Sequence, residues 1–379
     1  MEKRKFEKLN AEVSLLGFGL MRLTLLEDGK LDYKKAERLI DMALEGGVNY
    51  FDTAWPYLSK QSELFIGDAL VKRHPRDKYY IATKLPSFLV STADKIEQFF
   101  NDHFERMKTD YIDFYLMHSI SWESWQKLKS FGIIEFIEKQ RADGKIRSIG
   151  FSTHDKPAGV EKIVADYDWD FAQIQMNYMD WEDLDIKSSY AALEKAGLPV
   201  VVMEPIRGGG LAKPDNPGVK KLMELLPNQT PSALALRWAA GHKNVKVVLS
   251  GMNEIQQMEE NLKTFEKFQP LNDEESAAID ESIKAIKSLP IIPCTSCEYC
   301  KDCPNKINIP SILQKYNSYI MYDSPAPFLF FYAGAHPPGQ SAADCVECGS
   351  CVKACPQKID IPARLKEIAA LHKKITEKK

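Results

Sequence analysis

Eight short apolar segments, rich in β-branched or aromatic residues, recur along the first 250 or so residues of this chain, and segments of helical period separate them. The strand candidates span residues 14–21, 49–54, 79–84, 112–119, 146–153, 171–177, 199–205 and 245–252. Eight βα units over about 250 residues predict a closed (β/α)8 TIM barrel of the α/β class, rather than an open doubly wound sheet.

Helices are predicted between these strands, because KKAERLIDMALEGG, DKIEQFFNDHFERM and EFIEKQRADGK place apolar residues three and four positions apart. The spacing of roughly 25 to 45 residues between strands leaves room for a crossover helix each time. We expect the leading stretch KFEKLNAEVS to form a hairpin that closes the bottom of the barrel.

The composition limits the partners of the protein. Its 379 residues include 50 basic and 53 acidic side chains, and the formal net charge of −3 offers no field for nucleic acid or an anionic membrane surface. The amino end lacks the pattern of a signal peptide, and no apolar run reaches the length of a membrane span. We therefore expect a cytoplasmic protein that acts on small molecules.

Polar residues follow three successive strand candidates, where barrels of this type carry their active sites. Asp52 and Tyr57 follow the second strand, Lys84 ends the third and His118 ends the fourth. Each residue alone equally suits a structural role, as a turn cap, a loop aromatic, a solvated lysine or a core histidine. Together, at the same end of three strands, they predict a catalytic site.

These segments also carry a resemblance, because DTAWPY, ATK and MHS, in this order and spacing, resemble the tetrad segments of the aldo-keto reductases. The resemblance runs from about residue 5 to about residue 265 and includes GFG, GKIRSIGFS, QIQMNY, EPIRGGGLA and EENL. It implies a barrel enzyme that uses NADPH or NADH to interconvert an aldehyde or ketone and its alcohol.

The chemistry of the four residues agrees with this activity. A phenol is a weak acid at pH 7, and the nearby ammonium of Lys84 would lower the pKa of Tyr57. Asp52 would be the counter-charge of Lys84, and His118 would orient the carbonyl oxygen. Tyr57 would then protonate the alkoxide that hydride transfer leaves.

The resemblance also implies where the cofactor binds. Ser152 and Gln173 would bind the carboxamide, and the RGGGLA loop, with Arg207, Gly208 and Gly209, would lie beside the pyrophosphate. A glycine triplet alone is equally typical of a flexible turn. The other implied cofactor residues follow the eighth strand: Gly251, Met252, Gln257, Glu260 and Asn261.

Several positions depart from the family. Met203 and Glu204 stand where many members have an aromatic ring on the nicotinamide, and Thr153 follows Ser152 where they have asparagine. After the eighth strand no basic residue occurs before Lys263, although a 2′-phosphate calls for lysine or arginine. We therefore do not expect a preference for NADPH, and either NADH or NADPH fits the sequence.

All eight cysteines lie in two similar runs, CTSCEYCKDCPNKINIP at 294–310 and CVECGSCVKACPQKIDIP at 345–362. In a reducing cytosol such cysteines bind metal or do redox work. The second run has the CxxCxxCxxxCP spacing of bacterial two-cluster ferredoxins, and the first is one residue shorter before its last cysteine. We predict two [4Fe-4S] clusters; two zinc sites of four thiolates each are the alternative.

In such ferredoxins the fourth cysteine of each run serves the other cluster. The predicted ligand sets are therefore Cys294, Cys297, Cys300 and Cys355 for one cluster, and Cys345, Cys348, Cys351 and Cys303 for the other. The repeated PxKIxIP tails predict two related half-modules, each leading into a helix. Residues 1–289 would form the barrel and residues 290–379 a small α-helical ferredoxin-like domain.

A branch of the aldo-keto reductases has such an extension, and the chain resembles that branch over its whole length. Hydride chemistry moves two electrons together, clusters pass single electrons, and no flavin motif is evident. The first hypothesis is an oxidoreductase whose clusters exchange electrons with a partner protein or a flavin. The alternative is a non-catalytic redox-sensing or interaction protein on a dinucleotide-binding barrel. The aromatic segment 323–339 would shield a cluster, dock a partner or pack on the barrel.

Overall fold

The computed structural model describes residues 1–294, 299–322, 328–329 and 337–377. The chain forms two compact units, each composed of two stretches of sequence. Unit 1 comprises Met1–Gly208 and Ser232–Glu275, and unit 2 comprises Gly209–Pro231 and Ser276–Lys379. Among the described residues, none of the helices has the length and apolar character that crossing a membrane requires.

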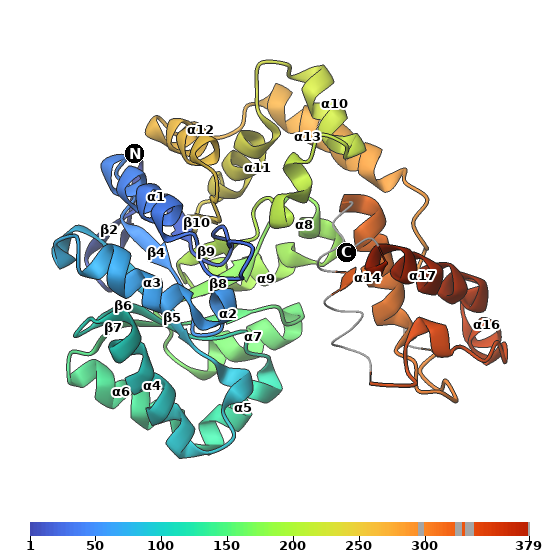
Figure 1. Cartoon of the computed structure of the whole chain (residues 1–379), viewed down its shortest axis with the longest axis horizontal. Coiled ribbons are helices and arrows are strands. Elements are labelled where there is room, and N and C mark those ends of the chain that lie inside the picture. Colours follow the sequence, from blue (N-terminus) through green and yellow to red (C-terminus); the bar gives the residue numbers. More distant parts are fainter. Residues whose placement is uncertain (295–298, 323–327, 330–336, 378–379) are drawn as a thin grey trace. The chain divides into compact units, whose positions relative to one another are not determined.

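Unit 1 contains a closed barrel of parallel strands in the order β10-β3-β4-β5-β6-β7-β8-β9, which confirms the predicted fold (Figure 1). The barrel strands are β3 (Leu16–Gly19), β4 (Tyr50–Asp52), β5 (Tyr80–Leu85), β6 (Ile112–Met117), β7 (Ile146–Thr153), β8 (Phe171–Gln175), β9 (Val200–Met203) and β10 (Val245–Ser250). Each overlaps one expected segment, because the strands are buried on both faces and therefore read as continuous apolar runs.

Helices follow the strands and cover the outside of the barrel (Figure 1). The three helices expected from periodicity are present as α1 (Tyr33–Glu45), α4 (Ala93–Met107) and α6 (Ile133–Ala142). The other helices that begin in unit 1 are α2 (Tyr57–Lys60), α3 (Ser62–Ile66), η1 (Gly67–Val71), η2 (Arg76–Lys78), η3 (Ser87–Leu89), α5 (Trp122–Ser130), α7 (Pro157–Asp166), α8 (Asp180–Asp183), α9 (Ile186–Lys195), η4 (Arg207–Ala212), α12 (Ile255–Glu266) and α13 (Asp273–Lys287); α11 (Pro231–Ala240) begins one residue before the chain re-enters unit 1.

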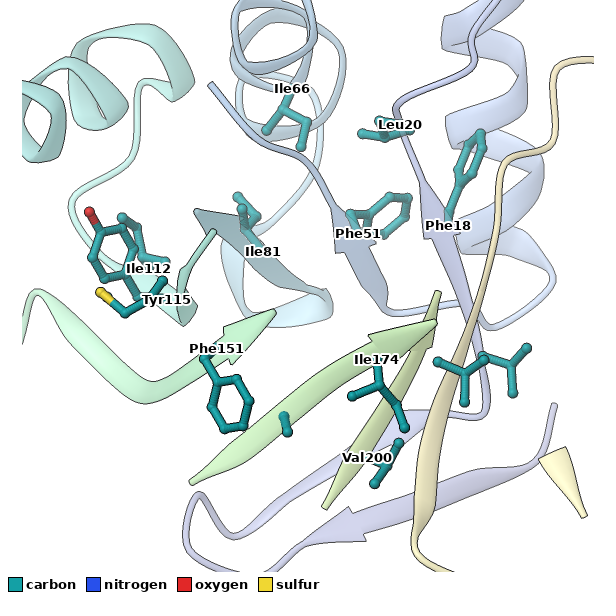
Figure 2. Packing of buried hydrophobic residues seen from close by; sticks show 14 of the residues in the cluster. Phe18, Leu20, Phe51, Ile66, Ile81, Ile112, Tyr115, Phe151, Ile174 and Val200 are labelled. Atoms are coloured by element: carbon teal, nitrogen blue, oxygen red, sulfur yellow. The ribbon is translucent and has the colours of Figure 1, made fainter. Parts of the chain in front are cut away.

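Alternate strand residues face the inside and the outside of the barrel. Tyr50, Phe114 and Phe171 belong to an inner apolar cluster. Their sequence neighbours, such as Phe51 and Tyr115, belong to a larger cluster shared with the covering helices, which Figure 2 shows. Because Asp52 and Lys84 lie two residues after the inward-facing Tyr50 and Ala82, the alternation also aims their side chains inward.

The hairpin expected at the amino end is present as β1 (Lys3–Phe6) paired antiparallel with β2 (Ala11–Ser14). Phe6 and Val13 join the inner cluster, and the ring of Phe6 lies 5.1 Å from that of Phe114 and 6.4 Å from that of Phe171. Phe171 begins β8, so the hairpin closes the amino-terminal end of the barrel. The carboxyl ends of the strands are left for a functional site.

Unit 2 has an apolar core of its own, to which described cysteines of both runs are packed. Its helices are α10 (Pro217–Leu225), α14 (Ile309–Tyr322), η5 (Ala342–Asp344), α16 (Ser350–Ala354) and α17 (Ile361–Thr376), together with the greater part of α13. Asn216 caps α10 and also donates from Nδ2 to the carbonyl oxygen of Met321 in α14, at 2.8 Å. The domain boundary at residue 289 stays a prediction.

The two PxKIxIP tails have the same local structure. Lys306 and Lys358 have φ angles of 53° and 52°, and their amides donate to the carbonyls of Cys303 and Cys355. The helices α14 and α17 then begin at Ile309 and Ile361. This correspondence confirms two related half-modules, each leading from its last cysteine into a helix.

Candidate functional site

Asp52 and Lys84 form a fully buried ion pair at the carboxyl ends of neighbouring strands. Nζ of Lys84 lies 2.7 Å and 2.8 Å from the two carboxylate oxygens of Asp52 and also donates to the carbonyl oxygen of Thr53, at 2.7 Å. All three ammonium protons therefore have acceptors. Burial alone would lower the pKa of Lys84, but the charge and hydrogen bonds of Asp52 raise it, so the ammonium stays charged.

Tyr57 lies beside this ion pair at the start of α2. The Nζ atom of Lys84 is 4.9 Å from the centre of the Tyr57 ring, and that ring meets His118 edge to face at a centroid distance of 5.8 Å. The structure thus brings together all four residues expected from the strand ends.

The pKa of Tyr57 is raised, which corrects the expectation that Lys84 lowers it below its usual value. Burial raises the pKa, and the nearby charge of Lys84 only partly offsets this, with Asp52 opposing Lys84. The phenol therefore keeps its proton at neutral pH, as a proton donor must.

His118 is held in the neutral state. Burial and the positive charge of Lys84 lower its pKa to about 3. Its Nδ1 atom is buried and has no hydrogen-bond partner among the described residues, which favours the tautomer with the proton on Nε2. The ring of Phe88 also contacts His118, with 5.6 Å between the two ring centres. Sequence reasoning did not identify Phe88 as part of the site.

The backbone after Tyr57 is strained. Leu58, Ser59 and Lys60 have φ angles of 52°, 52° and 72°, the left-handed region that side chains with a Cβ rarely adopt. Such strain costs of order 1 kcal/mol or more per residue and concentrates at functional sites. No turn signal in the sequence marks this segment, since it contains no glycine or asparagine.

Ser152 and Gln173 lie side by side as register partners on β7 and β8. The hydroxyl of Ser152 accepts from the amide of Ser119, at 2.8 Å. Gln173 is buried, its Nε2 reaches only the sulfur of Met203 at 3.6 Å, and its Oε1 has no partner among the described residues. A buried, unsatisfied amide oxygen suits the amide nitrogen of a carboxamide.

The loop after β9 departs from a nicotinamide-stacking arrangement. Met203 is partly buried, and Glu204 is exposed with a φ angle of 56°. Arg207, expected beside the pyrophosphate, forms an ion pair with the buried carboxylate of Asp180, at 2.8 Å. Gly208 and Gly209 have φ angles of 65° and 97°, so this turn requires glycine.

The residues expected to bind the cofactor after β10 have contacts within the protein. Oε1 of Gln257 accepts from the amides of Asn253 and Glu254 and thereby caps α12. Nδ2 of Asn261 donates to the hydroxyl of Ser250, and Oε1 of Glu260 accepts from Gln256. Gly251 and Met252 follow directly after β10, where Met252 is buried.

Cysteines of both runs line one cavity of about 120 Å³ in unit 2. They are Cys300, Cys303, Cys345, Cys348 and Cys351, and this set contains all four cysteines expected around one cluster. The described cysteines are not in disulfides. Cys294 and Cys355 pack against the core of unit 2, and Cys297 lies outside the described residues. Thiolates are the ligands of iron–sulfur clusters, but the described residues include no group of three or more such side chains already arranged to hold a metal ion.

The barrel and the residues at its strand ends define an oxidoreductase, and the chain belongs to the aldo/keto reductase family, whose model matches residues 15–284. A model of the 4Fe-4S dicluster domain matches residues 293–359. Both halves of the resemblance noted in the sequence are thereby confirmed.

Individual relatives match the barrel region. The chain is 25% identical over 308 residues to L-galactose dehydrogenase of Arabidopsis thaliana, covering 75% of this chain and 94% of the relative. It is 25% identical over 287 residues to probable aldo-keto reductase 1 of Glycine max, covering 66% and 80%. The holo form of aldo-keto reductase AKR11C1 from Bacillus halodurans superimposes with a TM-score of 0.63 at 28% identity, covering 75% of this chain and 97% of that one.

Proposed function

We propose that the protein reduces a small aldehyde or ketone to its alcohol, and runs the reverse oxidation, with NADH or NADPH. The observation that carries the proposal is the charged Lys84, held by Asp52 and placed against the ring of a Tyr57 that keeps its proton. These are the groups that a carbonyl reductase needs at the point where an alkoxide forms.

The roles follow from the geometry and the charges. His118, neutral with its proton on Nε2, donates a hydrogen bond to the carbonyl oxygen and so orients it. The dinucleotide, when bound, supplies the hydride for the carbonyl carbon. Tyr57 gives its proton to the same oxygen, and Lys84 stabilises the phenolate that this leaves, by about 1.4 kcal/mol for each pKa unit.

The residues on β7 and β8 fit the nicotinamide end of the cofactor. Gln173 and Ser152 would hold the carboxamide, and the unsatisfied Oε1 of Gln173 supports this assignment. Gly208, Gly209, Gly251 and the start of α12 would receive the rest of the dinucleotide. Because Met203 and Glu204 offer no ring for stacking, orientation of the nicotinamide would depend on these hydrogen bonds.

For unit 2 we propose two [4Fe-4S] clusters with the exchanged fourth ligands, Cys303 and Cys355. Cys303 lines the same cavity as three cysteines of the second run, together with Cys300, whereas Cys355 is not among the lining residues, and this supports the exchange. The clusters would pass single electrons to a partner protein or a flavin. We propose a cytoplasmic location, because a reducing compartment keeps cysteines out of disulfides and so able to bind iron.

The test of the barrel activity is Tyr57→Phe, which removes one oxygen and keeps the ring. Reduction should fall about 100-fold or more, while folding, cofactor binding and iron content stay unchanged. The assay is anaerobic, with a panel of small aldehydes and ketones and both cofactors.

Tyr33→Phe, on the exposed side of α1, is the matched control and should keep full activity. Activity of Tyr57→Phe equal to that of the unmodified protein would contradict the proposal. Absence of turnover in the unmodified protein over the whole panel would favour the redox-sensing alternative.

A further inference from the structure

The pyrophosphate of a dinucleotide is doubly charged and needs a cation or several amides at its binding site. Arg207 was the cation expected from the sequence, but its guanidinium is committed to Asp180. That carboxylate also accepts from Gln175 and Asn177, at 2.5 Å and 2.6 Å. Breaking such a buried pair is costly, so Arg207 serves to fix its loop.

A different arginine lies against the glycines of this loop. Arg22 follows β3, is exposed, and forms no ion pair in the described part of the chain. A Cβ atom added to Gly208 would lie 3.2 Å from Nη2 of Arg22, so the guanidinium is next to the backbone of this turn.

The stem of Arg22 lies along a second loop. A Cβ atom added to Gly251, just after β10, would lie 3.5 Å to 3.7 Å from the Cβ, Cγ and Cδ atoms of Arg22. A hydrogen bond from Thr24 Oγ1 to the carbonyl oxygen of Asn253, at 3.1 Å, also joins the loops after β3 and β10. The side chain thus extends from one implied cofactor loop to the other.

We propose that Arg22 binds the pyrophosphate of the dinucleotide, with Gly208 allowing the backbone to approach the same phosphates. The inference rests on the proposed function, because it assumes that a dinucleotide occupies the barrel. A guanidinium can donate two parallel hydrogen bonds to phosphate oxygens. Because Arg22 forms no ion pair within the described residues, it breaks none when it binds a phosphate. The ligand chemistry is a diphosphate diester, common to NADH and NADPH.

The test measures direct binding of NADH, NADPH and ADP-ribose to the unmodified protein and to Arg22→Gln. Fluorescence measures the binding of the reduced cofactors, and calorimetry measures that of ADP-ribose. All three ligands carry the pyrophosphate, so all three dissociation constants should rise by a similar factor, about 10- to 100-fold. Arg22→Lys, which keeps the charge and loses the paired donors, should be affected less.

Arg38→Gln is the control, since it removes the same charge from the exposed face of α1. Equal affinities in Arg22→Gln and the unmodified protein would overturn the role of Arg22 while leaving the proposed function intact. A loss confined to NADPH would also overturn it, because Arg22 would then read the 2′-phosphate. Failure of the unmodified protein to bind any of the three ligands would instead overturn the dinucleotide site itself.

Discussion

Thr83 and Lys84, neighbours on β5, bind two different buried carboxylates on opposite faces of the strand. Lys84 reaches Asp52 inside the barrel, and the hydroxyl of Thr83 donates to Glu63 of α3, at 2.6 Å. The carboxylate of Glu63 is also hydrogen-bonded to His103 Nδ1, at 2.7 Å, and accepts from Arg106 Nε, at 2.8 Å. One strand end therefore holds a pair suited to catalysis and a pair that only supports structure, and variants separate the two.

Lys84→Met should abolish most activity and strengthen the part of the pH dependence of stability that comes from Asp52. Burial already raises the pKa of Asp52 in the folded protein even beside Lys84, and losing the ammonium that opposes burial raises this pKa further above the unfolded value. Stability is then highest below about pH 4 and falls as pH increases through neutrality, reaching a loss of about 3–5 kcal/mol. Urea unfolding at several pH values measures this, and adding Asp52→Asn should remove the dependence.

Glu63→Gln should destabilise the protein and leave the chemistry of the folded enzyme unchanged. Burial would raise the pKa of Glu63, but His103 and the other donors lower it, so this carboxylate stabilises the fold above about pH 4.5 and loses that effect as pH falls. We expect a loss of about 3 kcal/mol in urea unfolding at pH 7. A large fall in activity per folded molecule would show that Glu63 acts on the site through Thr83.

Ionisation of His118 should not change the reaction rate near pH 6.5, because its pKa of about 3 keeps the imidazole neutral throughout the assay range. In the unfolded chain it titrates near 6.5, so stability falls as pH decreases from 6.5 towards 3, by about 1.4 kcal/mol per pH unit at most. His118→Gln should reduce this slope. The measurement is urea unfolding between pH 4 and 8, and an unchanged slope would contradict the neutral state.

Cys303→Ser should damage the cluster whose other ligands are Cys345, Cys348 and Cys351. Anaerobically prepared protein should contain about eight irons and eight sulfides, and the variant about half. Iron and sulfide analysis with spin resonance of the reduced protein provides the measurement. Loss confined to the cluster of Cys294 would show that each run binds its own iron, and stoichiometric zinc would exclude the clusters.

NADH should bind at least as tightly as NADPH. No lysine or arginine occurs between Gly251 and Leu262, and Lys35, which reaches this region from α1, forms an ion pair with Glu254. No cation of this segment replaces the hydration that a 2′-phosphate would lose, and Arg22, beside Gly251, is assigned to the pyrophosphate. Fluorescence titration of both cofactors decides this, and a tenfold preference for NADPH would show that another basic group binds the phosphate.

The barrel could be predicted from the sequence because its strands are buried on both faces, as in the apolar run IDFYLM of β6. The ion pair of Asp52 and Lys84 was also predictable, since the carboxyl ends of parallel strands meet at one face. The partners of Arg207 and Glu63 were not, because Asp180 and His103 come from other elements and carry no local signal. The net pKa of Tyr57 depends on burial, which a single position in a sequence does not report.

The bond between Asn216 and Met321 joins residues 105 positions apart and has a consequence for synthesis of the chain. A ribosome releases residues 209–231 shortly before the last barrel strand, β10. The helices with which α10 shares unit 2 are released much later. The barrel can therefore close before residues 209–231 have helices to pack against. If unit 2 needs its proposed clusters to fold, a shortage of iron would leave the barrel closed and α10 without its partner helices.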